Sequence, residues 1–408
     1  MPEIQKLARL LGATLPDGRT VDVGLADGVV STVTTVEPTT LRTTPVQDDE
    51  LDLTGFLLLT APAEPHAHLD KALSWDRIAP PMGDLGLAIA SWRAHTYTMT
   101  AESILERATA AARMMLLNGT TAVRTHVDLL AGPEPLRGVE ALTTLRERLR
   151  GVMEFQITAL AAPDTPDEIV DAALDLGVDL VGGAPHLAAD PIADLDRLLA
   201  IAERRGVGTD IHTDESLHGE PTLVHYAKAV QGWPQGRIRS AGHCVRQGTL
   251  ETADLMTTVE AVLAADLGII SLPITNLYLQ GWEHPVSTPR GLTALRTFLD
   301  AGAKVAGGAD NVRDPFNPVG RGDALETASL LVTAGHLTLD EAYQAVSGGA
   351  RAVLGLAPAG AEPGAVADFL AVRGTTLGEV VAAAPAERVV LHRGAVVART
   401  SVVHETSF

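Results

Sequence analysis

The sequence predicts an α/β fold, namely a distorted (β/α)₈ (TIM) barrel with a small β-sandwich formed from the N- and C-terminal segments. The middle of the chain, residues 56–359, alternates strand-like and helix-like segments eight times, which favours a closed parallel barrel over an open sheet. Residues 1–55 and 360–408 instead contain short β-prone runs between turn signals. We therefore expect a composite β-sandwich domain from 1–55 plus 360–408, and a barrel domain over 56–359.

Turn residues divide the two end segments into short strands. Near the N-terminus, Pro16-Asp17-Gly18 and Asp27-Gly28 separate β-prone runs and are typical of hairpin turns. Near the C-terminus, β-prone runs at 364–374 and 387–399 follow each other, and Arg393-Gly394 is the expected turn within the second. Because both ends have this character and the middle does not, we expect them to pair into one unit.

In the middle of the chain, each predicted strand is followed by a predicted helix. The eight strands are expected at residues 55–63, 120–127, 152–160, 178–183, 207–212, 237–243, 267–273 and 304–309. Amphipathic helices are expected between them, for example at 101–119, 166–177 and 291–302, and each of these three ends on glycine, the residue favoured after a helix.

Composition limits the classes of partner. The 408 residues are 46% hydrophobic, and 31 basic against 51 acidic side chains give a net charge of −20, which disfavours binding to nucleic acid or an anionic membrane. The single cysteine, Cys244, excludes an intrachain disulfide and a cysteine-rich zinc site. The first residues lack the pattern of a secretory signal, and no apolar run reaches transmembrane length. We expect a cytoplasmic protein without a membrane partner.

Histidines and one aspartate follow the predicted strands. His66 and His68 come after the first strand, two residues apart and so on one face, while His212 ends the fifth strand and Asp310 follows the eighth. His243 ends the sixth. The carboxyl ends of barrel strands meet at one rim, and nitrogen donors with one carboxylate suit Zn²⁺ or Fe²⁺. A single histidine there is more commonly a packed residue, but this convergence favours a metal site.

Glu215 lies three residues beyond His212, just past the end of the fifth strand. A carboxyl group in this position can move a proton between a metal-bound water and a substrate nitrogen. The alternative is a solvated loop glutamate. Its place beside His212 favours the acid–base role.

Several motifs together resemble the cytosine deaminase branch of the amidohydrolase superfamily. They are HAHLDK at 66–71, RTHVD at 124–128, DIHTDE at 210–215, AGHCV at 241–245, ITNLYLQG at 274–281 and GGADNVRDPFNP at 307–318. The resemblance covers nearly the whole chain, including the composite end domain. It implies His66, His68, His212 and Asp310 as metal ligands, Glu215 as proton shuttle, and His243 as the residue that orients the attacking water, with Asp310 sharing in catalysis.

The lysines bear on the number of metal ions. Many members of the superfamily hold two metals bridged by a carboxylated lysine after the fourth strand. Here no lysine occurs between Lys71 and Lys228. We therefore expect one divalent ion per chain, Zn²⁺ or Fe²⁺.

The match to cytosine deaminases is incomplete where the substrate ring would bind. Those enzymes have a glutamine after the third strand, whereas residues 158–163 contain none. Asn311 replaces their acidic residue after the metal aspartate, and Phe316 replaces their tryptophan. Lys71 and the Asp310-Asn311 pair instead resemble N-isopropylammelide amidohydrolases, which act on triazines. A site with altered hydrogen-bonding groups discriminates against its former substrate, so cytosine is in doubt.

Six residues are candidate substrate contacts: Lys71, Leu85, His186, Gln280, Asn311 and Phe316. The ammonium of Lys71 can recognise an ionised ring oxygen or a carboxylate, the alternative being a surface salt bridge. His126 is expected either to hold the barrel together or to support the site from behind its ligands.

The sequence thus predicts a metal-dependent deaminase that hydrolyses a small nitrogen heterocycle and releases ammonia, active as a homo-oligomer. Two alternatives stay open. The same site could cleave an N-alkyl amine or open a cyclic amide. A non-catalytic relative is less favoured, because such proteins lose metal ligands and here the full set is present.

Overall fold

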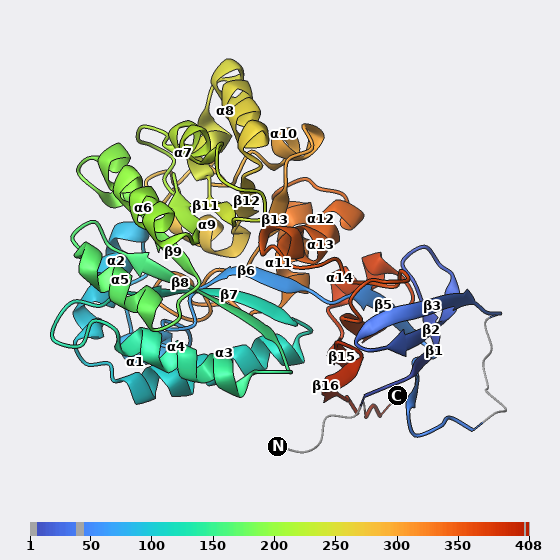
Figure 1. The fold of residues 1–408 in the computed structure, drawn as a ribbon. Helices are drawn as coiled ribbons and strands as arrows, with labels where there is room; N and C mark the ends of the chain where they lie inside the picture. Colours follow the sequence, from blue (N-terminus) through green and yellow to red (C-terminus); the bar gives the residue numbers. More distant parts are fainter. Residues whose placement is uncertain (1–5, 38–44, 404, 408) are drawn as a thin grey trace.

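The computed structural model describes residues 6–37, 45–403 and 405–407, and these form two sheets of eight strands. The larger unit in Figure 1 is a nearly closed parallel barrel in which neighbouring strands follow the chain order. Its strands are β6 (Ala63–Ala67), β7 (Ala122–Asp128), β8 (Glu154–Ala161), β9 (Leu180–Gly183), β10 (Gly208–Thr213), β11 (Arg239–His243), β12 (Gly268–Ser271) and β13 (Val305–Gly307). The ends meet where the His68 amide donates to the Asp310 carbonyl at 3.1 Å. The barrel prediction is confirmed.

Helices surround this barrel (Figure 1). They are α1 (Trp75–Ile78), α2 (Leu85–Thr96), α3 (Ala101–Leu117), α4 (Arg137–Arg148), α5 (Asp167–Asp175), α6 (Pro191–Arg205), α7 (Leu223–Val230), α8 (Thr252–Ala265), α9 (Pro273–Leu279), α10 (Leu295–Asp300), α11 (Ala324–Thr333), α12 (Leu339–Val346) and α13 (Gly348–Val353). Two 3₁₀ turns, η1 (Pro185–Leu187) and η2 (Val245–Thr249), follow β9 and β11. Within the described residues, no helix has both the length and the hydropathy needed to cross a bilayer.

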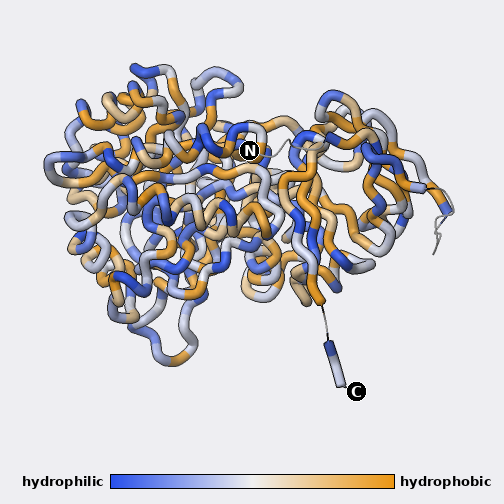
Figure 2. The backbone as a smooth tube through the Cα atoms, turned by 90° about the horizontal axis from the view of Figure 1, so that it is seen from below, coloured by the Kyte–Doolittle hydropathy of each residue, from blue (hydrophilic) through white to orange (hydrophobic). Residues whose placement is uncertain are grey.

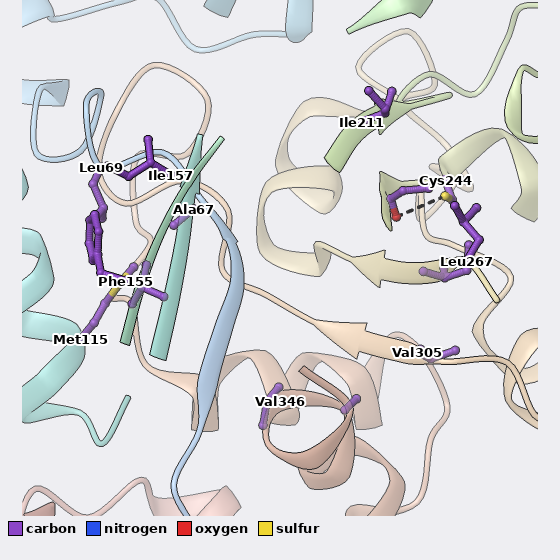
Figure 3. Close-up of a cluster of buried hydrophobic side chains, with 14 of the residues drawn as sticks. Ala67, Leu69, Met115, Phe155, Ile157, Ile211, Cys244, Leu267, Val305 and Val346 are labelled. Carbon is purple, nitrogen blue, oxygen red and sulfur yellow. Dashed lines mark hydrogen bonds between the residues drawn. The ribbon is translucent and has the colours of Figure 1, made fainter. Parts of the chain in front are cut away.

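Apolar side chains from strands and helices hold the barrel together. Figure 3 shows members of this buried cluster, among them Ile157 from β8, Ile211 from β10 and Val346 from α12. The Cys244 thiol lies in the same cluster and contacts the Ala241 carbonyl at 3.7 Å. Burying such side chains is the main stabilising contribution to the fold and fixes the strand ends on which the site is built.

The second sheet combines both ends of the chain, as predicted. Its strands are β1 (Arg9–Thr14), β2 (Thr20–Ala26), β3 (Val29–Thr35), β4 (Glu50–Asp52), β5 (Phe56–Thr60), β14 (Phe369–Arg373), β15 (Arg388–His392) and β16 (Ala395–Thr400), with α14 (Leu377–Ala383) between β14 and β15. All eight belong to one mostly antiparallel sheet with its own hydrophobic cluster. Figure 2 shows it as a smaller lobe rich in apolar strands.

Two of the expected turns have the geometry of tight hairpins. Asp27 and Gly28 join β2 to β3 with φ of 51° and 80°, and Arg393 and Gly394 join β15 to β16 with φ of 48° and 75°. Two consecutive positive φ angles define the type I′ turn, and glycine adopts the second without a steric cost.

The predicted first barrel strand, 55–63, differs from the structure. Its apolar run divides into β5, which pairs with β14 and β1, and β6, which begins the barrel at Ala63. Pro62 lies between them and has no amide hydrogen to continue a sheet, so the chain leaves one sheet and enters the other there. Residues 56–60 therefore pair with the terminal strands, while the domain boundaries themselves stay a prediction.

Candidate active site

The predicted metal ligands lie together at the carboxyl ends of β6, β10 and β13. His212 Nε2 is 3.3 Å from His66 Nε2 and 3.0 Å from His68 Nε2, and Asp310 Oδ1 is 3.3 Å from His68 Nε2 and 4.0 Å from His66 Nε2. Two donors at about 2.1 Å from a tetrahedral ion would be about 3.4 Å apart, so these spacings fit a small divalent cation. The four side chains are buried.

The electrostatics of this cluster also suit a cation. Burial, together with the neighbouring imidazoles, lowers the pKa of His212 well below its ordinary value, which keeps the neutral form that binds metals. Both carboxylate oxygens of Asp310 are buried without a hydrogen-bond partner among the described residues. A buried, unsatisfied carboxylate is costly, and an ion held by Asp310 and the three imidazoles would satisfy it.

The backbone is strained where the site residues leave their strands. His243, Cys244 and Asp310 have φ of 67°, 49° and 60°, in the left-handed region that residues other than glycine rarely adopt. Strain of this kind persists only where the surrounding structure imposes it, and it is concentrated at functional sites. Here His243 and Asp310, which have this strained backbone, also line the cavity at the barrel mouth.

Glu215 and His243 form the second part of the site. Glu215 Oε1 lies 3.5 Å from His243 Nδ1, and Glu215 Oε2 lies 3.6 Å from His186 Nε2. The Asn276 side-chain amide contacts His243 Nδ1 at 3.0 Å and so helps orient that ring. Burial raises the pKa of Glu215 to about 8, against the opposing effect of the Lys71 charge. A carboxyl with a raised pKa is suited to general acid–base catalysis.

A polar network contacts the predicted ligands from inside the barrel. His126 Nε2 is 3.1 Å from His66 Nδ1, and Asp210 Oδ2 is 3.3 Å from His126 Nε2 and 3.7 Å from His66 Nδ1. The fully buried Arg124 donates to Asp210 at 3.1 Å and to Ser240 Oγ at 2.9 Å. Groups behind a metal-binding histidine fix its orientation. His126 thus contacts the predicted ligand His66, and its supporting role stays a prediction.

This network leads to a prediction about stability. Asp210→Asn leaves the Arg124 charge buried without its counter-charge, so we expect a loss of about 3–5 kcal/mol in the free energy of unfolding. The urea midpoint of the variant against the parent protein measures this. The control is Glu147→Gln, which removes an exposed pair with Arg150 and should change stability by less than about 1 kcal/mol. Equal effects of the two substitutions would contradict a structural role for the buried pair.

Lys71 is buried beside the predicted ligands and is not a free cation. Its Nζ donates to Asp128 Oδ1 at 2.6 Å and lies 3.1 Å from His68 Nδ1, and Trp92 Nε1 donates to Asp128 Oδ2 at 2.6 Å. The rings of Trp92 and Phe316 lie 5.5 and 5.7 Å from the ammonium. Asp128 therefore balances the charge of Lys71, and the pair is presented together at the edge of the site.

A cavity of about 570 Å³ opens above the cluster. Its lining includes nine of the residues singled out from the sequence: His68, Lys71, Leu85, His212, Glu215, His243, Asp310, Asn311 and Phe316. Ile89, Trp92 and Leu160 add apolar walls. A largely apolar cavity with a few convergent polar groups is the usual form of a site for a small organic molecule.

Three candidate substrate contacts have other partners in the structure. Gln280 does not line the cavity, and its amide donates to the Glu215 carbonyl at 2.6 Å. His186 also lies outside the lining and faces Glu215. The Asn311 amide donates to Asp314 at 2.8 Å. Contact of these three residues with a substrate stays a prediction.

Four residues that contact the site were not predicted from the sequence: Asp128, Trp92, Asp210 and Asn276. Asp128 ends β7 at the same rim as the predicted ligands, so the rule that selected Asp310 could also have selected it. Trp92 comes from α2, where no local signal indicates that its indole reaches the Asp128 carboxylate. Asp210 is part of the DIHTDE motif, but no local pattern indicates its pairing with Arg124, which lies 86 residues away.

Comparison with known proteins places the chain in a family. The Amidohydrolase family profile matches residues 74–404, and the chain is 30% identical over 392 residues to a pterin deaminase of Rhizobium rhizogenes, covering 93% of this chain and 88% of that protein. The chain belongs to the amidohydrolase family. This confirms the resemblance seen in the sequence, and it makes the protein a hydrolase of carbon–nitrogen bonds.

Solved structures agree with the fold of this amidohydrolase. A 5-methylcytosine deaminase from Klebsiella pneumoniae superposes with a TM-score of 0.86 at 24% identity, covering 98% of this chain and all of that one. An N-isopropylammelide isopropylaminohydrolase from Burkholderia multivorans superposes with a TM-score of 0.77 at 28% identity, covering 96% and 99%. Both similarities extend over the barrel and the terminal sheet.

Proposed function

We propose that this amidohydrolase is a metal-dependent deaminase of a small nitrogen heterocycle. It would hydrolyse the bond between the amidine carbon and its exocyclic nitrogen and release ammonia. The observation that carries the proposal is that donor atoms of His66, His68, His212 and Asp310 approach one another to 3.0–4.0 Å, and that all of them except His66 line one cavity together with Glu215 and His243. Similarity to a pterin deaminase over nearly the full length supports the same reaction class.

The proposed ligands are His66, His68, His212 and Asp310, and they would hold one Zn²⁺ or Fe²⁺ per chain. Bound there, the divalent ion supplies Lewis-acid activation of water, whose pKa falls towards about 7. The four ligand atoms make one compact set, and no lysine follows β9 to bridge a second ion at this centre.

Glu215 and His243 would handle the protons of the reaction. The water oxygen adds to the amidine carbon while Glu215 passes one water proton to the ring nitrogen. Asp310 and His243 steer the second proton, which Glu215 delivers to the exocyclic amine. The carbon–nitrogen bond then breaks, a ring carbonyl forms, and ammonia leaves. The distance of 3.5 Å between Glu215 Oε1 and His243 Nδ1 supports a shared role of these two side chains in the proton transfers.

The cavity favours a ring larger than a single pyrimidine. Its volume of about 570 Å³ is within the range of sites for drug-sized ligands, and its walls come from α2 and from the segment after β8. Ala162, Asn311 and Phe316 line it. A bicyclic guanidine-like ring such as a pterin is therefore the first substrate to test, and Lys71 with Asp128 presents a donor and an acceptor to its edge.

Cytosine is expected to be a poor substrate, at least about 10²-fold below the best ring in kcat/KM, because the hydrogen-bonding groups it requires are replaced. A screen of aminated pyrimidines, triazines, creatinine-like rings and pterins, measured by ammonia release, checks this. If cytosine were the best substrate in this screen, the predicted preference for another ring would be wrong, and the enzyme would be a cytosine deaminase.

A second candidate is hydrolysis of an N-alkyl amine. The 28% identity to a solved N-isopropylammelide isopropylaminohydrolase favours it, as does Lys71 beside the ligand pair. Product analysis separates the two, since this reaction releases an alkylamine instead of ammonia. Opening of a cyclic amide would release neither ammonia nor an alkylamine.

A further inference from the structure

A second group of metal-binding side chains lies on the surface, outside the cavity described above. His218 belongs to the segment between β10 and α7, residues 214–222, while Glu283 and His284 belong to the segment between α9 and α10, residues 280–294. His218 Nε2 is 3.7 Å and His284 Nε2 is 3.5 Å from the same oxygen, Glu283 Oε1. Two segments distant in sequence thus bring three donors together.

The spacing and chemistry of these donors fit a divalent transition metal. One ligand atom from each residue lies within 4.8 Å of the other two, and all three side chains are exposed, which leaves the remaining coordination positions to water. Two imidazole nitrogens and a carboxylate oxygen suit Zn²⁺, Ni²⁺ or Co²⁺, whereas Mg²⁺ and Ca²⁺ prefer oxygen ligands. The net charge of −20 also attracts cations to the surface.

Local hydrogen bonds hold the backbone next to these donors. Arg246 Nε donates to the Gly219 carbonyl at 2.9 Å, directly after His218. The His284 amide donates to the Gly281 carbonyl at 2.9 Å, and Thr288 Oγ1 donates to the His284 carbonyl at 2.7 Å. Because both segments are already ordered, little conformational entropy would be lost on binding an ion.

We propose that His218, Glu283 and His284 form a second, surface site for a divalent transition metal that ties these two segments together. The segments are also joined by the bond from Gln280 to the Glu215 carbonyl. An ion at the surface site would therefore fasten the segment that carries Glu215 from its outer side. The proposal does not depend on which reaction the cavity catalyses.

The test measures Ni²⁺ binding to untagged holoenzyme that carries its resident ion, by calorimetric titration and by metal content after dialysis. We expect one additional Ni²⁺ per chain, and no additional Mg²⁺. The double variant His218→Ala/His284→Ala should weaken the additional binding at least about tenfold while keeping the resident ion. Glu283→Gln, which changes only one donor, should weaken it as well. A rise in Tm on adding Ni²⁺ should occur in the parent protein and not in the double variant.

His225→Ala is the matched control. His225 is half-buried and lies 2.7 Å from Asp196, but it belongs to no three-residue cluster of metal-binding side chains among the described residues. Additional Ni²⁺ should bind this variant as tightly as the parent protein. The proposal is overturned if the double variant binds Ni²⁺ like the parent, or if His225→Ala loses as much affinity as the double variant.

Discussion

His212→Ala is expected to lose its resident divalent ion and to lower turnover by about 10³-fold or more, which corresponds to about 4 kcal/mol in the activation barrier. His212 is the member of the cluster with the shortest approaches to the other imidazoles, 3.0 and 3.3 Å. Without it, His66, His68 and Asp310 would provide only three donors. Metal content of the purified variant measures the first effect and ammonia release from the best ring measures the second.

The control for this prediction is His336→Ala, an exposed histidine outside the cavity. It should keep both metal and turnover. A folded His212→Ala protein, judged by circular dichroism, separates loss of the ion from loss of the structure. If this variant kept the full metal content, His212 would not be a ligand and the proposed centre would be wrong.

Glu215→Gln is expected to keep the metal and to lower turnover by about 10²-fold or more. Glutamine preserves the size and polarity of the side chain, but it cannot accept and release a proton. Since the carboxyl group lies 3.5 Å from His243 and its pKa is raised by burial, the missing group is the one placed to move protons. Single-turnover rates together with metal content measure the two effects separately.

The matched control is Glu220→Gln, an exposed glutamate in the same segment. It should leave turnover unchanged, which shows that loss of a charge from this segment is not sufficient. Near-normal turnover of Glu215→Gln with metal retained would make this residue structural. Loss of metal together with turnover would instead make it a ligand.

The sequence predicted the barrel and the positions of its main site residues because both depend on local pattern. Seven of the eight predicted barrel strands overlap the observed strands β7 to β13, and the ligand candidates follow strands whose carboxyl ends must share a rim. The exception is the first strand, where a continuous apolar run gives no sign that its halves pair with different sheets. Pro62 marks the division, but only the pairing of β5 with β14 shows which half belongs to the end sheet.

What the sequence by itself determined is which chemical groups are candidates for the site: three histidines and an aspartate proposed to bind a metal, a glutamate proposed to move a proton, and no lysine after the fourth barrel strand to bridge a second ion. Only the tertiary structure decided which side chains balance the charges of the site residues and which hydrogen bonds orient them. The sequence left Lys71 open between substrate recognition and a surface salt bridge, and the structure pairs it in a buried site with Asp128, which lies 57 residues away. Gln280 likewise holds the Glu215 carbonyl across 65 residues. Such pairings depend on which side chains the fold brings within about 3 Å, because hydrogen bonds and buried charges act over short distances that no local pattern encodes.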